Sequence, residues 1–148
     1  MNVLHVIQFF NPKYGGTVQS CYYQSKYLAE RGHKVTIYTT NYNFDQEYAN
    51  SLSNVRIIPF HCQANMQSFF YSPQMKKQLK KDIITLNIIH LHNFRTYQNV
   101  VVHRYATKNN IPCILQAHGD LPFFEKSGLK ILYDIVWGHN ILKNASRL

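Results

Sequence analysis

Acidic residues are scarce in this chain of 148 residues. Seven Asp and Glu stand against sixteen Lys and Arg, which gives a formal net charge of +9. An excess of this size favours anionic partners such as nucleotide phosphates, nucleic acid or an anionic membrane surface. The basic residues are spread along the chain, apart from Lys76-Lys77 and Lys80-Lys81. A dedicated nucleic-acid groove is therefore not indicated, and we expect no nucleic-acid partner.

Cysteine is also sparse. Cys21, Cys62 and Cys113 are odd in number and show no C-x-x-C spacing, which favours buried free thiols in a reducing compartment. The first ten residues lack the basic segment that opens a signal peptide, and no apolar run approaches the length of a membrane span. We therefore expect a cytoplasmic protein.

Three common catalytic or nucleotide-binding motifs are missing. The chain has no G-x-G-x-x-G, and its second expected strand ends in Thr39-Thr40-Asn41 rather than in an acid that could bind a ribose, which disfavours a nicotinamide enzyme. The absence of G-x-x-x-x-G-K-[ST] disfavours a P-loop ATPase. A Ser-His-Asp hydrolase is unsupported because there is no G-x-S-x-G elbow.

What the sequence does contain is a regular alternation of strand and helix patterns. Apolar residues make up 45% of the chain and charged residues 16%, as in globular proteins. Strands are expected at 2–10, 33–40, 55–60, 87–92 and 111–117, helices at 18–31, 73–86, 98–108 and 129–143, and loops at 41–53 and 61–71. The alternation predicts a single α/β domain over 1–148, with a doubly wound, Rossmann-like parallel sheet.

In this topology the functional loops follow the strands, at the carboxyl edge of the sheet. Tyr14-Gly15-Gly16-Thr17 follows the first strand, His92-Asn93-Phe94-Arg95 the fourth, and His118-Gly119-Asp120 the fifth. The two glycines lead directly into a helix that Thr17 can cap, and helix N-terminal N–H groups favour phosphate. A tight turn explains the two glycines equally well.

The histidines of the fourth and fifth strands raise the question of a metal. His90 and His92 are two residues apart on a strand, so both point to the same side. With His118 they could hold a metal ion, but no acid or cysteine accompanies them, so this is the minority interpretation. The preferred one packs His90 in the sheet and places His92 nearer the mouth of the site. His5 belongs to no pattern and is assigned a structural or surface role.

Four segments, taken in order, resemble the N-terminal half of the retaining, GT-B-fold enzymes of glycosyltransferase family 4. They are the loop at 12–17 with its following helix, the turn and strand at 31–39, the Ile-Ile-His-Leu-His strand at 88–92, and the strand at 111–117 that ends in His118-Gly119. Single motifs of this kind are weak, but four in the right order are specific. The resemblance covers essentially the whole chain.

The resemblance implies transfer of a sugar from a nucleotide-sugar donor to a glycan or lipid-linked acceptor, as in polysaccharide or glycolipid assembly. By resemblance, His118 is the catalytic residue beside the donor sugar. The residues implied for the donor diphosphate are Gly15, Gly16 and Thr17, and those implied for acceptor and sugar are Tyr14, His92, Asn93, Gly119 and Asp120. No metal or other cofactor is expected, since basic side chains and helix N-termini neutralise the diphosphate.

The chain departs from the family pattern in one large respect. The family's second, donor-binding domain is absent from this chain, and residues 145–148 resemble the lead-in to a further strand. We therefore expect a native polypeptide that continues into the missing C-terminal domain, and little or no transferase activity from this chain alone. The alternative is a non-catalytic, stand-alone Rossmann-like subunit that binds a ligand or recruits a catalytic partner.

An apolar cluster suggests one further partner. Met66, Phe69, Phe70 and Tyr71 lie in a segment expected to be a loop, where their exposure would create an adhesive patch. Together with the positive charge, this patch predicts peripheral contact with an anionic membrane, at the inner face where lipid-linked acceptors reside. The alternative is that the cluster covers the sheet or contacts the missing domain.

Overall fold

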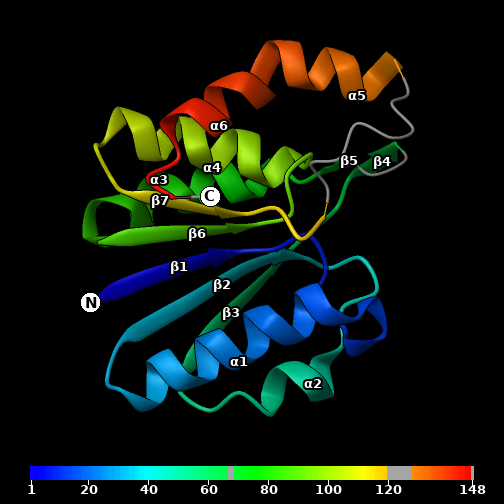
Figure 1. Ribbon diagram of the computed structural model, residues 1–148. Coiled ribbons are helices and arrows are strands. Elements are labelled where there is room, and N and C mark those ends of the chain that lie inside the picture. The colour runs from blue at the N-terminus through cyan, green and yellow to red at the C-terminus, as the bar shows by residue number, and fades with distance from the viewer. Residues whose placement is uncertain (67–68, 120–127, 148) are drawn as a thin grey trace.

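A parallel sheet of five strands forms the centre of the molecule. The computed structural model describes residues 1–66, 69–119 and 128–147. The strands are β1 (Asn2–Val6), β2 (Lys34–Thr40), β3 (Val55–Phe60), β6 (Ile88–His92) and β7 (Cys113–Gln116). Their order is β3-β2-β1-β6-β7, and each neighbouring pair is parallel (Figure 1). The order reverses between β1 and β6, which makes the carboxyl ends of these strands the switch point where α/β folds bind ligands.

Helices cover both faces of the sheet. On one face lie α1 (Gly16–Glu30) and α2 (Gln46–Asn50). On the other lie α3 (Gln74–Asp82), α4 (Tyr97–Lys108), α5 (Gly128–Tyr133) and α6 (His139–Asn144), with a π-helical stretch, Asp134–Gly138, between the last two (Figure 1). The predicted doubly wound Rossmann-like sheet is confirmed. No helix among the described residues is long and apolar enough to cross a membrane.

Two segments predicted to be loops contain regular structure. The segment 41–53 holds the short helix α2, which begins because the Asp45 carboxylate accepts a hydrogen bond from the Tyr48 backbone N–H at 2.9 Å. The segment 61–71 forms an antiparallel pair of strands, β4 (Ala64–Met66) and β5 (Phe69–Tyr71). Both predictions were wrong because elements this short leave almost no periodic pattern in the sequence.

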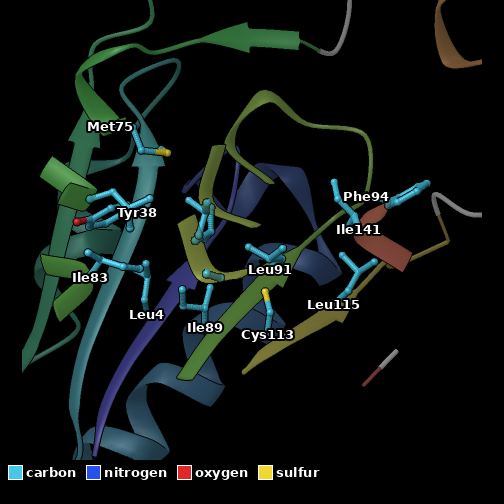
Figure 2. Packing of buried hydrophobic residues seen from close by; sticks show 14 of the residues in the cluster. Leu4, Tyr38, Met75, Ile83, Ile89, Leu91, Phe94, Cys113, Leu115 and Ile141 are labelled. Carbon is cyan, nitrogen blue, oxygen red and sulfur yellow. The ribbon is translucent and has the colours of Figure 1, made fainter. Parts of the chain in front are cut away.

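The larger core lies on the side of α3 and α4. Leu4 from β1, Ile89 and Leu91 from β6, and Leu115 from β7 are almost completely buried there (Figure 2). A second core on the α1 side contains the following residues: Ile7, Phe10, Val18, Cys21, Ile37, Ala49 and Leu52.

Helix α4 presents a different face from the one predicted. The apolar residues Val100, Val101 and Tyr105 recur at a spacing that predicts them as the inward face of this helix, but they are only partly buried. The fully buried side chains of this helix include Val102 and Ala106. The helix is rotated because its first turn also buries polar residues that hydrogen-bond to the loop after β6. This rotation brings α4 into the construction of the site.

Candidate functional site

A cavity of about 180 Å³ opens at the carboxyl edge of the sheet, at the switch point. It is lined by Ile7, Gln8, Phe9, Tyr14, Thr17, Val18 and Asn93. Three of these residues, Tyr14, Thr17 and Asn93, are among those predicted from the sequence. They come from two different loops, and the sheet brings them together because parallel strands end at the same edge.

The loop after β1 delivers the N-terminus of α1 to this cavity. Asn11 accepts a hydrogen bond from the Lys13 N–H at 3.1 Å and starts a short 3₁₀ turn, Pro12–Tyr14. Gly15 follows with φ of 77°, a conformation that favours glycine, and occupies the N-cap position of α1. The helix begins at Gly16, so the predicted capping role of Thr17 was wrong. The Gly15 N–H donates to the Pro12 carbonyl and the Val18 N–H to the Gly15 carbonyl. The N–H groups of Gly16 and Thr17 therefore remain without an acceptor among the described residues.

Aromatic rings form one wall of the cavity. The Tyr14 ring stacks on Phe9 with centroids 4.4 Å apart, and the Tyr14 hydroxyl accepts a hydrogen bond from the Asn43 side chain at 2.7 Å. Phe9 in turn meets Phe70 of β5 edge-on at 4.9 Å. Phe9 was not predicted, because the sequence placed it inside a strand at 2–10, whereas β1 ends at Val6 and leaves Phe9 in the loop at the switch point. The ring of Tyr42 leans against Phe70 at 4.8 Å and is partly exposed.

These contacts change the expectation for the apolar cluster at 66–71. Phe70 is 5% exposed and belongs to the packed wall behind the cavity, whereas Tyr71 is 43% exposed. The side chain of Met66 lies outside the described part of the structure. The hairpin therefore contributes at least one of its aromatic rings to the interior rather than to an adhesive patch.

The loop after β6 is held in place from below by α4. Asn93 has φ of 64°, a left-handed conformation that asparagine tolerates better than most residues. Its carbonyl accepts a hydrogen bond from the Asn99 side-chain amide at 2.7 Å, and its N–H donates to the Gln116 carbonyl at 3.0 Å. Thr96 caps α4 by accepting a bond from the Asn99 N–H at 3.1 Å. The polar first turn of α4 thus fixes the cavity wall at Asn93.

Arg95, the last residue of this predicted loop, is tied to the C-terminal helices. Its Nε lies 2.9 Å from one Asp134 carboxylate oxygen and its Nη2 lies 2.8 Å from the other. Both side chains are largely shielded from solvent. This two-point geometry matches the fork of the guanidinium to the carboxylate and anchors the π-helical stretch to the β6 loop.

Behind the cavity, three histidine rings form a hydrogen-bonded chain. His5 Nδ1 lies 3.0 Å from His92 Nε2, and His92 Nδ1 lies 3.1 Å from His118 Nε2. The ring of His90 stacks on His92 with centroids 4.3 Å apart. His118 and Gly119 both have positive φ, at 49° and 88°, and Asp120 lies outside the described residues.

The structure places His92 differently from the sequence. It was predicted near the mouth of the site, but it is fully buried and has no exposed surface with which to contact an acceptor. His5, to which the sequence assigned a structural or surface role, is its hydrogen-bonding partner. The signal for His5 was available only through the strand order, because β1 and β6 pair in a register that places His5 opposite His90.

Burial keeps His5, His90 and His92 uncharged near neutral pH. Desolvation lowers the pKa of His5 to about 3, with a further contribution from His90. Desolvation likewise lowers the pKa of His90 to about 4 and holds the pKa of His92 well below its usual range. An imidazolium in this position would lose its hydration without gaining an acidic partner among the described residues.

His5, Cys21 and His92 could also hold a metal ion. One ligand atom from each lies within 4.8 Å of the others, and two imidazoles with one thiolate suit zinc. Burial raises the pKa of the Cys21 thiol to about 12, so a metal would first have to displace its proton. The set differs from the predicted one, His90, His92 and His118, because α1 brings a cysteine to the buried side of the sheet.

Comparison with known proteins identifies the family. The model of Glycosyltransferase Family 4 matches residues 14–147. This chain belongs to glycosyltransferase family 4. Its fold is that of the N-terminal half of a GT-B enzyme, and the predicted resemblance is confirmed. None of the curated protein sequences matches this family 4 chain.

A solved structure supports the same fold. The crystal structure of MurG from Acinetobacter baumannii matches the family 4 chain with a TM-score of 0.61 at 13% sequence identity. The match covers 98% of this chain and 39% of MurG, so the chain spans about two fifths of MurG's length. At this identity the likeness establishes the fold alone.

Proposed function

We propose that this chain is the acceptor-side domain of a retaining glycosyltransferase that uses a nucleotide-sugar donor and a glycan or lipid-linked acceptor. The observation that carries the proposal is the convergence of the α1 N-terminus, the Tyr14 ring and Asn93 on one cavity at the switch point. Family membership supplies the class of reaction, and the cavity supplies a place for it.

The donor diphosphate is proposed to bind at the start of α1, at Gly15, Gly16 and Thr17. The N–H groups of Gly16 and Thr17, which have no acceptor among the described residues, and the positive end of the helix dipole favour an anion. Gly15 adds no side chain, so a phosphate can approach the backbone closely. We propose that this arrangement, with basic residues elsewhere, neutralises the diphosphate without a metal ion.

The acceptor and the donor sugar are proposed to lie between the loops after β1, β6 and β7. Tyr14 and Asn93 offer polar groups at the cavity wall, while Gly119 and Asp120 follow His118. His118 is proposed to hydrogen-bond the donor sugar at the reacting centre, and the leaving diphosphate accepts the acceptor proton. His92 is buried and is proposed to act indirectly, through its hydrogen bond to His118.

The decisive experiment is a transfer assay on the native polypeptide. Its mass in the source cells, determined with an antibody against this domain, decides which protein to purify. Incubation with nucleotide-sugar donors and NMR analysis of the product anomer should show retention. His118→Ala should reduce the rate by about 10²- to 10⁴-fold, the range for loss of a positioned catalytic side chain, whereas the exposed His61→Ala should not. Inversion of the anomer would overturn the retaining mechanism.

The alternative is a non-catalytic subunit. The chain spans 39% of MurG's length, which is compatible both with a stand-alone subunit and with part of a longer protein. A native polypeptide of 148 residues that transfers no sugar alone, but does so with a co-purified partner, would support this alternative. A species more than twice this length with its own activity would exclude it.

We also propose peripheral contact with an anionic membrane, through a different surface from the one predicted. The exposed apolar residues of the C-terminal helices are Ile131, Leu132, Ile135, Val136 and Trp137. Lys130 and Lys143 flank them in the sequence. Apolar side chains beside lysines suit the headgroup region of anionic lipid. Co-sedimentation should be stronger with anionic than with zwitterionic vesicles and weaker for Ile135→Ser, while Tyr71→Ser serves as the control. Binding that ignores lipid charge would contradict the proposal.

A further inference from the structure

The hydrogen-bonded histidines His5, His92 and His118 connect β1, in the middle of the sheet, to the loop after β7. His5 lies on β1, His92 is the last residue of β6, and His118 follows β7. Two hydrogen bonds of 3.0 and 3.1 Å join the three rings in this order. His118 therefore has a defined connection to the buried interior at its Nε2 atom.

The central ring imposes one direction on both hydrogen bonds. A neutral imidazole carries a proton on only one nitrogen, so it donates from one atom and accepts at the other. His92 is fully buried and its pKa is well below the usual range because of desolvation, so it is neutral at pH 7. If His92 accepts from His5, it must donate to His118, and if it donates to His5, it must accept from His118. The tautomers of all three rings are coupled.

The far end of the chain selects between these two directions. His5 Nε2 is buried and has no hydrogen-bond partner within the described structure. Orphaned buried N–H groups are rarer in proteins than orphaned acceptors. The proton of His5 therefore belongs on Nδ1, from which it donates to His92 Nε2. His92 then donates from Nδ1 to His118 Nε2.

We propose that His5 and His92 are positioning residues that fix His118 as the Nδ1–H tautomer, a hydrogen-bond donor toward an oxygen-rich ligand. The use of that donor on a sugar or phosphate oxygen rests on the proposed function, but the tautomer itself does not. The backbone of His118 supports a positioning role, because a non-glycine residue with φ of 49° needs its surroundings to hold it. The bond from His92 is one such restraint.

The test is a two-bond ¹H–¹⁵N correlation spectrum of the ligand-free 148-residue chain at pH 7.5, with histidine ring nitrogens labelled. His5, His92 and His118 should each show a protonated Nδ1 and a bare Nε2, with a preference of roughly tenfold or more for this form. Opposite tautomers for His5 and His118, or the Nε2–H form in all three, would overturn the proposal.

Variants separate positioning from a general structural role. His5→Leu removes the donor to His92, so His118 should become a mixture of tautomers. His5→Asn restores a donor near the Nδ1 position and should restore the Nδ1–H form. His90→Phe is the matched control, because His90 stacks on His92 but lies outside the hydrogen-bonded chain. An unchanged His118 spectrum in His5→Leu would refute the coupling.

If His5→Leu does not fold, the wild-type and His5→Asn spectra still decide the tautomer. If the tautomers are as proposed but the native polypeptide transfers no sugar, the proposed function fails and the inference about the histidine chain stands.

Discussion

Strands β1, β6 and β7 present very different side chains on their two opposite faces. Toward α3 and α4 they show side chains such as Leu4, Leu91 and Leu115, all almost completely buried among other apolar groups. Toward α1 they show His5 and His90, which pair in register on β1 and β6. The first face packs into an apolar core, whereas the second carries the titratable histidine side chains.

The coverage of the two faces explains part of this difference. The first face is covered by α3, α4 and α6, whereas the second is only partly covered by α1. A groove of about 490 Å³ is left beside α1, with His5, His90 and Ile114 among its lining residues. Fully covered surface favours apolar side chains, while the edge of a groove tolerates imidazoles that remain neutral. Stability is therefore expected to depend mainly on one face and pH sensitivity on the other.

Acid should produce the largest contrast between the faces. His5 and His90 have folded-state pKa values of about 3 and about 4, below the unfolded value of 6.5. As pH falls below about 6.5, the unfolded state binds protons that the folded state refuses, so stability decreases until the folded pKa values are reached. Between pH 7 and pH 5 we expect a loss of roughly 4 kcal/mol for the pair.

Denaturant unfolding at the two pH values measures this loss. His90→Phe should make the pH dependence shallower, because one buried titrating group is removed. The exposed His61→Asn is the control and should follow the wild type. Equal pH dependence in all three proteins would show that the histidine face does not sense acid.

Two neighbouring residues of β7 allow the contribution of each face of the sheet to stability to be compared by mutation. Leu115 is 1% exposed on the helix-covered face, whereas Ile114 lines the groove on the other and is partly exposed. Leu115→Ala should cost about 3 kcal/mol through lost burial and a cavity, and Ile114→Ala about 1 kcal/mol. Urea denaturation of the two variants measures the difference. A larger loss from Ile114→Ala would mean that another segment covers the groove.

The cap of α4 connects the apolar face to the site, and a smaller effect is expected there. Thr96→Ala removes the acceptor for the Asn99 N–H and should destabilise the domain by about 1 kcal/mol. It should also perturb Asn93, whose carbonyl bonds to Asn99. Unfolding measurements and backbone amide shifts of Asn93 test both. Thr107→Ala, exposed near the end of the same helix, is the matched control and should change neither.

The outer side of the helical layer should show the smallest effect. Ile135 is 68% exposed, so Ile135→Ser should change stability by less than about 0.5 kcal/mol. Thermal unfolding of the isolated chain checks this. A loss comparable to that of Leu115→Ala would indicate that the apolar surface of the C-terminal helices is already covered in solution, for example by a second copy.

The final helix shows the limit of the sequence pattern. Leu132, Tyr133, Ile135 and Val136 form one apolar run, yet only Tyr133 is buried, with its hydroxyl bonded to the Phe94 carbonyl at 3.0 Å. An apolar residue in a helix can face a core or an external partner, and local periodicity is the same in both cases. The hairpin of β4 and β5 was missed for a different reason, because its strands are too short to show a periodic pattern.

The sequence by itself determined which strands of the main sheet and which longer helices follow one another along the chain. It also determined the doubly wound topology, the glycosyltransferase family and three of the residues at the cavity. These follow from local signals, because hydrophobic period, glycine turns and motif order are written along the chain. Only the tertiary structure decided that His5 and His118 both hydrogen-bond to His92, that His92 is fully buried, and that Phe9 stacks on Tyr14. These contacts join residues up to 87 positions apart, and they depend on strand order and register, which no local pattern encodes.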